Sequence, residues 1–182
     1  MNMPAGVELR WPLAGASLLT VLAKLLYKVW PARQRPRRPH LKPMTANLPQ
    51  GCVVPYRIQD DELRICLISL RSQTGWGFPK GLVDPPESLP EAALREAFEE
   101  AGIRGHLVGD PLGSYSYVKR GVNLDVTVFL MRVTEVVKNW PERRVRERQF
   151  CTVAKARALL TVPGQLQLLD RALARLAHRP HR

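Results

Sequence analysis

The chain has 182 residues, of which 45% are hydrophobic and 24% charged; these proportions exclude a wholly disordered protein and leave little room for a second full domain. Lysines and arginines number 28 against 16 acidic residues, so the formal net charge is +12 and anionic partners are favoured: phosphates, nucleic acid or an acidic membrane surface. The three cysteines are far apart in sequence and lack metal-ligand spacing. They therefore argue against a disulfide framework or a structural zinc site, and for a reducing compartment.

Residues 1–43 form a basic N-terminal extension that differs in composition from the rest of the chain. Residues 11–30 are mostly apolar and predict a helix, but their uncharged run ends at Ala23 and is shorter than the roughly 20 residues needed to span a bilayer. Residues 31–43 contain four prolines and five basic residues, which predicts an extended linker.

Three interpretations of this extension are open. A helix lying on the membrane surface, followed by a basic tether, would give a weak contact with anionic lipid through residues 11–43. A basic segment almost free of acidic residues is also typical of an organelle presequence. In the interpretation that we favour, the extension has no function, or translation begins at Met44 and the extension is not made. We therefore expect a cytoplasmic protein, peripheral at the membrane if the first interpretation holds.

Residues 44–182 have the pattern of one folded α+β domain. Short runs rich in β-branched residues at 51–57 and 63–71 flank the turn-like sequence QDDE and predict a hairpin. Two further strand-like runs occupy 113–118 and 124–136. Leucines at spacings of three and four predict a final helix over 164–178.

Between these runs lies the most informative segment, residues 81–103. Ser88 followed by Glu91 is a capping box, and Gly102 is a stop signal, so we expect a helix from about residue 89 to 101. One face of that helix is apolar and should pack on a sheet: Leu94, Ala97, Phe98 and Ala101.

Three glutamates crowd the opposite face of this helix: Glu96, Glu99 and Glu100. Like charges at this spacing destabilise a helix unless something neutralises them, and clustered oxygen ligands suit a hard divalent cation such as Mg²⁺. The alternative is an ordinary solvated acidic face, in which Arg95 pairs with Glu91 or Glu99.

The spacing of the charged residues extends this pattern. Gly81, five residues, Glu87, seven residues, and then Arg95 to Ile103 resemble the Nudix box, G-x5-E-x7-R-E-U-x-E-E-x-G-U, in which U is apolar. All seven fixed positions match. The resemblance implies a Nudix fold: a mixed β-sheet in an α/β/α sandwich, cleaving a nucleoside diphosphate linked to another group.

The flanking sequence is similar to one branch of that family. Residues 51–57, 65–81 and 132–150 resemble diphosphoinositol polyphosphate phosphohydrolases and their bacterial relatives. Lys80-Gly81-Leu82 stands where many animal members have a glycine triplet. This departure leaves dinucleoside polyphosphates as at least an equal candidate substrate.

The resemblance also implies roles for individual residues. Glu96 and Glu100 would bind Mg²⁺ or Mn²⁺, and Gly81 would turn the loop and offer its carbonyl to the metal. Glu99 would be the general base, with the loop residues Glu142 and Glu147 as competitors. Glu87 and Arg95 would orient the helix.

Basic residues near the mouth of the site are candidates for phosphate recognition. Arginine suits bidentate contacts and lysine acts more as a point charge. The candidates are Arg57, Arg71, Lys80, Lys119 and Arg146. Trp76, Tyr115, Tyr117 and Trp140 are candidates to stack on a base, although we favour a core role for them, and we expect Cys52 and Cys66 to be buried.

We therefore expect a metal-dependent pyrophosphohydrolase acting on a small polyphosphorylated substrate, a dinucleoside polyphosphate or a diphosphoinositol polyphosphate. A non-catalytic Nudix module that binds nucleotide or RNA is the alternative. No aromatic-rich RNA-binding signature accompanies the positive charge, so we predict no specific nucleic-acid partner.

Overall fold

A computed structural model describes residues 47–72 and 74–178. The basic extension predicted over 1–43, with its helix over 11–30 and its linker over 31–43, lies outside the described residues. Among the helices that are described, none is both long and apolar enough to cross a membrane.

The described elements follow the order expected for an α+β domain. They are β1 (Leu48–Gln59), β2 (Glu62–Ser69), β3 (Trp76–Gly77), β4 (Lys80–Leu82), α2 (Leu89–Ala101), β5 (Ile103–Leu107), β6 (Gly113–Lys119), β7 (Val122–Val136), β8 (Arg148–Thr152), α3 (Val153–Leu159) and α4 (Pro163–Ala177).

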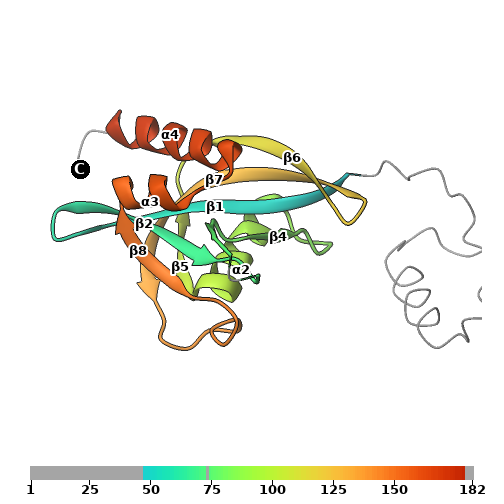
Figure 1. Ribbon diagram of the computed structural model, residues 1–182, viewed down its shortest axis with the longest axis horizontal. Coiled ribbons are helices and arrows are strands. Elements are labelled where there is room, and N and C mark those ends of the chain that lie inside the picture. The colour runs from blue at the N-terminus through green and yellow to red at the C-terminus, as the bar shows by residue number, and fades with distance from the viewer. Residues whose placement is uncertain (1–46, 73, 179–182) are drawn as a thin grey trace, which may run out of the picture. The chain divides into compact units, whose positions relative to one another are not determined.

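The strands form one mixed sheet with a central path β3-β2-β1-β7-β5; β4 pairs with β1, β6 with β7 and β8 with β2. The β1–β7 pair is parallel and the other pairs are antiparallel. Helix α2 covers one face of the sheet and α3 and α4 cover the other, as Figure 1 shows. The α/β/α sandwich implied by the sequence is confirmed.

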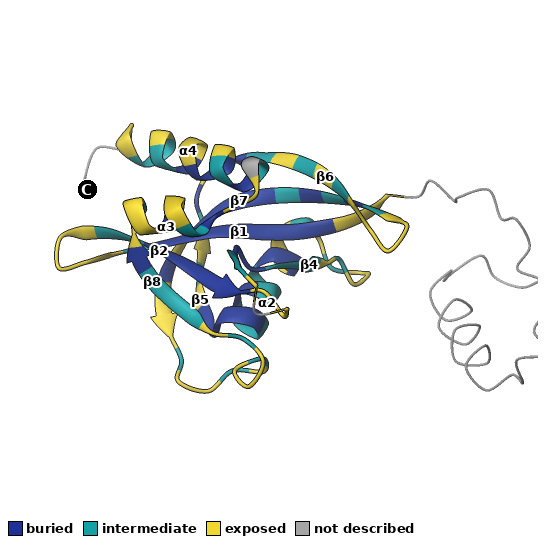
Figure 2. Ribbon diagram, in the orientation of Figure 1, coloured by how far each residue is buried: buried dark blue, intermediate teal, exposed yellow. Residues whose placement is uncertain are grey.

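Central strand β1 is buried along most of its length, because helices cover both faces of the sheet there (Figure 2). Cys52 and Val54 belong to the core under α3 and α4, whereas Val53 belongs to the core under α2. Alternate residues of one strand thus build two cores.

The predicted hairpin is present as β1 and β2, and the strands β6 and β7 form a second hairpin. Asp60 and Asp61 join β1 to β2 with φ values of 52° and 59°, the left-handed geometry of a two-residue type I′ turn. Arg120 and Gly121 join β6 to β7 in the same way, with φ values of 53° and 78°. The predicted last helix is α4.

Helix α2 begins and ends where the sequence predicts. The Ser88–Glu91 capping box is formed, and Gly102 ends the helix with a left-handed φ of 60°. The predicted packing face is confirmed for three of its four residues, since Ala97 and Ala101 are fully buried and Leu94 packs against the core under α2. Phe98 is only partly buried, and the Arg104 guanidinium lies 4.5 Å from the centroid of its ring.

The fully buried apolar side chains of α2 are all alanines: Ala92, Ala93, Ala97 and Ala101. The reason lies in Gly51 of β1, where an added Cβ would be 2.5 Å from the Leu89 carbonyl oxygen and 2.6 Å from the Ala93 nitrogen. The helix therefore lies almost on the strand backbone, which leaves room only for small side chains.

Candidate active site

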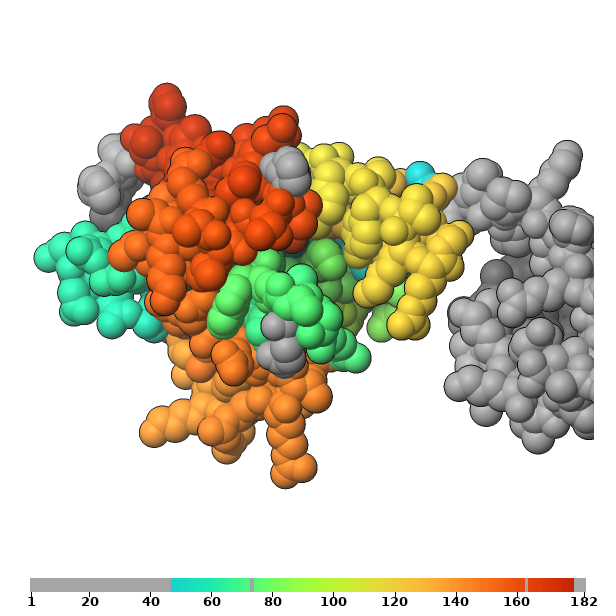
Figure 3. All heavy atoms as spheres, viewed as in Figure 1, coloured from blue at the N-terminus to red at the C-terminus, as the bar shows by residue number. Residues whose placement is uncertain are grey.

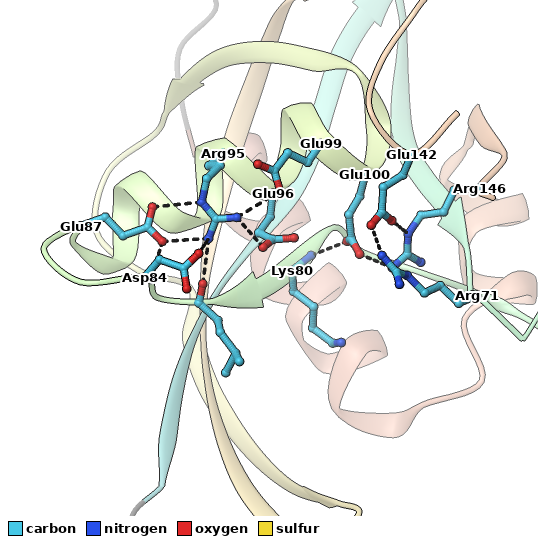
Figure 4. Close-up of polar contacts among 11 residues, drawn as sticks. Arg71, Lys80, Asp84, Glu87, Arg95, Glu96, Glu99, Glu100, Glu142 and Arg146 are labelled. Atoms are coloured by element: carbon cyan, nitrogen blue, oxygen red, sulfur yellow. Dashed lines mark hydrogen bonds and ion pairs between the residues drawn. The ribbon is translucent and has the colours of Figure 1, made fainter. Parts of the chain in front are cut away.

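Two arginines organise the acidic residues of α2 and its neighbours into two adjacent groups (Figure 4). Arg95, on α2 itself, contacts Glu87, Glu96 and Glu99. Arg146, from the segment between β7 and β8, contacts Glu100 and Glu142. The like charges predicted to crowd one face of α2 are thus neutralised by protein cations.

Arg95 ties the loop before α2 to the helix. Its Nε and Nη2 donate to the Glu87 carboxylate at 3.1 and 2.8 Å, and Nη2 also donates to the Leu82 carbonyl at 2.8 Å. Its Nη1 donates to Glu96 at 2.7 Å and to Glu99 at 3.1 Å. The hydrogen bonds from Arg95 hold the pKa of Glu87 below its ordinary value.

Glu91 does not take part in this network. Its carboxylate accepts from the Ser88 backbone and hydroxyl at 2.7 Å, as the capping box requires. Of the two pairings considered for a solvated acidic face, Arg95 therefore makes the one with Glu99 and not the one with Glu91. Arg95 also pairs with Glu87, so the glutamate that precedes the helix is part of the same network.

Glu100 is the most buried of the three clustered glutamates, with 7% of its side chain exposed. Its Oε2 accepts from the Lys80 backbone N–H at 2.9 Å, and its Oε1 accepts from Arg146. Burial raises the pKa of the Glu100 carboxyl to about 7, against the lowering effect of these two donors. Burial also raises the pKa of Glu96, against the hydrogen bond from Arg95.

Glu99 and the loop acids lie in different surroundings. The Glu99 side chain is 41% exposed, so water reaches it more freely than Glu96 or Glu100. Although burial alone would raise the pKa of Glu142, hydrogen bonds from Arg146 and Arg71 lower it. Glu147 is exposed, and its backbone N–H donates to the Ser69 hydroxyl at 2.9 Å.

Gly81 lies directly against Glu96. An added Cβ at Gly81 would be 1.9 Å from the Glu96 Oε1, so this position accepts a side chain only if the Glu96 carboxylate moves away. The close approach comes from the pairing of β4 with β1, in which Gly81 is opposite Gly51. Two glycines thus let the helix, the strand and the carboxylate meet.

Carboxylates are ligands that a hard divalent cation prefers, and Glu96, Glu99 and Glu100 supply three of them from one helix. No group of three or more acidic, histidine or cysteine side chains among residues 47–72 and 74–178 is arranged to hold an ion. Arg95 contacts Glu96 and Glu99, whereas a different arginine holds Glu100. An Mg²⁺ ion typically takes only one or two carboxylates and completes its shell with water and substrate phosphate.

We call Glu96, Glu99, Glu100 and Glu142 the cluster. Three of the five predicted phosphate-binding residues contact one of its members. Arg71 is 68% exposed and pairs with Glu142. Lys80 is on β4, with its Nζ 5.3 Å from the centroid of the Tyr117 ring. Arg146 is 10% exposed, and its Nε, Nη1 and Nη2 all donate to protein oxygens.

The other two predicted residues contact none of these glutamates. Arg57 stacks on the Phe150 ring at 3.8 Å and donates to Gln59. Lys119 is exposed and ends β6 beside the hairpin turn. The sequence could place both in or near strands but could not show which end of the sheet they occupy.

Most of the aromatic candidates pack as core residues. Trp76, Tyr115 and Tyr117 are partly buried against the core under α3 and α4. Trp140 instead lies at the end of α2, with the Arg148 guanidinium 4.4 Å from the centroid of its ring. Sequence reasoning assigned no role to Arg148, whose Nη1 donates to the Ala101 carbonyl at 2.6 Å.

Comparison with known proteins gives consistent matches. The family model described as NUDIX domain matches residues 48–172. Nudix hydrolase 17, mitochondrial, of Arabidopsis thaliana is 36% identical over 136 residues, which cover 70% of this chain and 74% of the relative.

Two further matches concern particular substrates. Diphosphoinositol polyphosphate phosphohydrolase 2 of Rattus norvegicus is 36% identical over 84 residues, covering 46% of this chain and 45% of the relative. A solved binary complex of the C. elegans Ap4A hydrolase superposes with a TM-score of 0.63 at 25% identity, covering 72% of this chain and 99% of that structure.

Proposed function

We propose that this chain, which belongs to the Nudix hydrolase family, uses the glutamates of α2 for metal-dependent cleavage of a pyrophosphate bond in a nucleoside-diphosphate-type substrate. Family membership makes the chain a pyrophosphohydrolase and favours hydrolysis over a non-catalytic nucleotide- or RNA-binding module. The observation that carries the finer proposal is the grouping of Glu96, Glu99 and Glu100 beside Gly81.

In this proposal Glu96, Glu100 and the Gly81 carbonyl hold Mg²⁺ or Mn²⁺. When bound, the cation neutralises charge on the phosphates and lowers the pKa of its water. The close contact between Gly81 and Glu96 supports this assignment, since it brings the backbone of Gly81 next to the Glu96 carboxylate. Arg95 and Glu87 hold the loop and the helix in register through their paired hydrogen bonds.

Glu99 acts as the general base that accepts the proton of the attacking water. Its exposure supports this role, because a base must reach the water that it deprotonates. Glu142 is less suited, since two arginines bind it and lower its pKa, which weakens a base.

Arg71 and Lys80 contact the phosphates of the substrate. Arg71 supports this best, because its guanidinium is largely exposed while its contact with Glu142 keeps it at the edge of the cluster. Arginine in such a place offers a bidentate contact to phosphate. Arg57 and Lys119 would not take part, since their positions do not bring them to the glutamates.

The substrate is a dinucleoside polyphosphate or a diphosphoinositol polyphosphate. The match to the rat diphosphoinositol polyphosphate phosphohydrolase supports the second class, and the match to the C. elegans Ap4A hydrolase supports the first. Both substrates are highly anionic, which agrees with the net charge of +12.

A substrate panel tests this proposal. The full chain with Mg²⁺ would be incubated with dinucleoside polyphosphates, diphosphoinositol phosphates, nucleoside triphosphates, ADP-ribose and triphosphorylated RNA, and the products resolved by ³¹P NMR. We expect turnover on one of the first two classes, abolished by EDTA and strongly reduced in Glu99→Gln. If no substrate of the panel is hydrolysed although the protein still binds metal, a non-catalytic binding module is favoured instead.

For location, we propose the cytoplasm, together with a weak contact between residues 11–43 and an anionic membrane surface. The Arabidopsis relative is named as mitochondrial, which makes an organelle presequence the alternative. Fluorescent fusions of the full chain and of residues 44–182 distinguish these cases. Diffuse signal from both supports the cytoplasm, whereas mitochondrial signal from the full chain alone supports the presequence.

A further inference from the structure

Arg146 is held by three acceptors from three separate segments of the chain. Its Nε donates to Glu142 at 2.6 Å, its Nη1 to the Ser69 carbonyl at 2.9 Å, and its Nη2 to Glu100. Only 10% of its side chain is exposed. A guanidinium bound on three sides has a fixed position, and reaching a substrate phosphate would require breaking these bonds.

Glu100 is fixed from outside its own helix. One carboxylate oxygen accepts from the Lys80 N–H of β4 and the other from Arg146. The contacts of Glu96 and Glu99, in contrast, come from Arg95 on the same helix. The orientation of Glu100 therefore depends on β4 and on Arg146 in the segment between β7 and β8, whereas the arginine that holds the other two glutamates lies on α2.

Arg148, the first residue of β8, and Glu142, in the segment before it, hold the last turn of α2. Helix α2 has no basic residue in that turn, and Arg148 supplies the missing cation: its Nη1 donates to the carbonyls of Ala101 and Gly102 at 2.6 and 3.1 Å. The Glu142 N–H donates to the Glu99 carbonyl at 3.0 Å. Part of the segment between β7 and β8 projects from the domain surface (Figure 3). Arg146 of this segment donates to Glu100 of α2, and Arg148 of β8 donates to the Ala101 carbonyl.

We infer that Arg146 is a positioning residue for metal binding: it orients the Glu100 carboxylate and does not bind substrate phosphate. The inference rests on the proposed function, in which Glu100 is a metal ligand, and it revises the phosphate-binding role that the sequence suggested for Arg146. Partners that orient metal ligands typically change metal affinity by about 10–100-fold when they are lost.

Direct Mn²⁺ binding tests this inference without using activity. Free Mn²⁺ would be measured by EPR during titration of the full chain in wild-type, Arg146→Gln and Arg146→Lys forms. We expect Arg146→Gln to weaken binding about 10–100-fold. Arg146→Lys should restore part of the affinity, because lysine keeps the charge but lacks the fork that reaches three acceptors.

A matched control is Arg157→Gln, which removes another arginine from an ion pair, with Asp170, formed between α3 and α4. We expect its Mn²⁺ affinity to stay within about twofold of wild type, because its ion pair joins helices on the other face of the sheet from α2. Circular dichroism would show that each variant is folded.

The outcomes separate the inference from the proposed function. If wild type binds Mn²⁺ and folded Arg146→Gln binds it equally or more tightly, the positioning role is wrong while the metal site stands. If wild type binds no Mn²⁺, the proposed function fails and the inference fails with it. If Arg146→Gln does not fold, Glu142→Gln replaces it, since this change weakens one anchor of Arg146; unchanged binding in that variant would also overturn the role.

Discussion

Gly51 lies on β1 beneath the first turns of α2, and its replacement by alanine tests the close approach that places this helix on the sheet. The added Cβ would be 2.5 Å from the Leu89 carbonyl oxygen and 2.6 Å from the Ala93 nitrogen. Both neighbours are backbone atoms of a hydrogen-bonded helix, so neither can rotate away. The helix would have to move by roughly 1 Å to reach an ordinary contact distance.

The expected cost follows from this overlap. Overpacking a well-packed site costs about 1–3 kcal/mol, and the gain from a less flexible unfolded chain returns about 0.4–1 kcal/mol. With the cost of overpacking near the middle of its range, about 2 kcal/mol, the free energy of unfolding should fall by about 1–2 kcal/mol. With a urea m-value of about 2 kcal/mol per molar, the denaturation midpoint should fall by roughly 0.5–1 M.

Urea denaturation followed by circular dichroism measures this shift, and activity gives a second readout. Because α2 carries the glutamates, a displacement of roughly 1 Å should also lower kcat/KM by tenfold or more. Gly75→Ala is the control, since the nearest atom to its added Cβ is the Leu70 Cδ1 at 3.4 Å. An unchanged midpoint in Gly51→Ala, or equal shifts in both variants, would refute this packing.

Three further predictions concern the site and the core. Gly81→Ala should weaken Mn²⁺ binding with little loss of stability, since the added methyl group displaces only the end of the Glu96 side chain; EPR titration and a thermal melt would measure the two effects. Arg95→Lys should lower kcat/KM by about tenfold or more in steady-state assays, because a lysine cannot reproduce the forked contacts of the guanidinium. Burial raises the pKa of Cys52 and Cys66 from 9.0 to about 12, so we expect both thiols to be silent toward DTNB at pH 8 until the protein unfolds. Because these thiols ionise more readily in the unfolded chain, they should also make the free energy of unfolding fall as the pH rises from about 9 to about 12, as urea denaturation across this range would show.

The features that the sequence predicts well are those with local signals. Helix α2 is predicted to the residue because its first turn is capped by Ser88 and Glu91, and its last turn is followed by Gly102. The β1–β2 hairpin is predicted because two aspartates form its turn. Strand β4 has no such signal: its three residues are a strand only because they pair with residues 50–52 of β1.

The same distinction holds for the site. Glu87, Arg95 and Glu99 lie within 13 consecutive residues, so their spacing can be read from the sequence, and in the structure Arg95 contacts both glutamates. The contact between Arg146 and Glu100 joins residues far apart in the sequence, so it depends on how the chain folds between β7 and β8. Charge alone could not tell a mostly enclosed arginine such as Arg146 from an exposed one such as Arg71.

The most direct test of the proposed site compares two glutamates of the same helix. Glu100 is buried beside β4 and is a proposed metal ligand, whereas Glu91 caps Ser88 and contacts no member of the cluster. Glutamine also serves in a capping box, so Glu91→Gln should leave the helix intact. Initial rates of pyrophosphate-bond hydrolysis would be measured across Mg²⁺ concentrations for wild type and both variants.

We predict that Glu100→Gln loses more than about 100-fold in rate, since removing a metal ligand should cost at least as much as removing one of its supporting partners. Glu91→Gln should stay within about threefold of wild type. A Glu100→Gln enzyme that keeps the wild-type rate and Mg²⁺ dependence would contradict the assignment of the active site to the glutamates of α2.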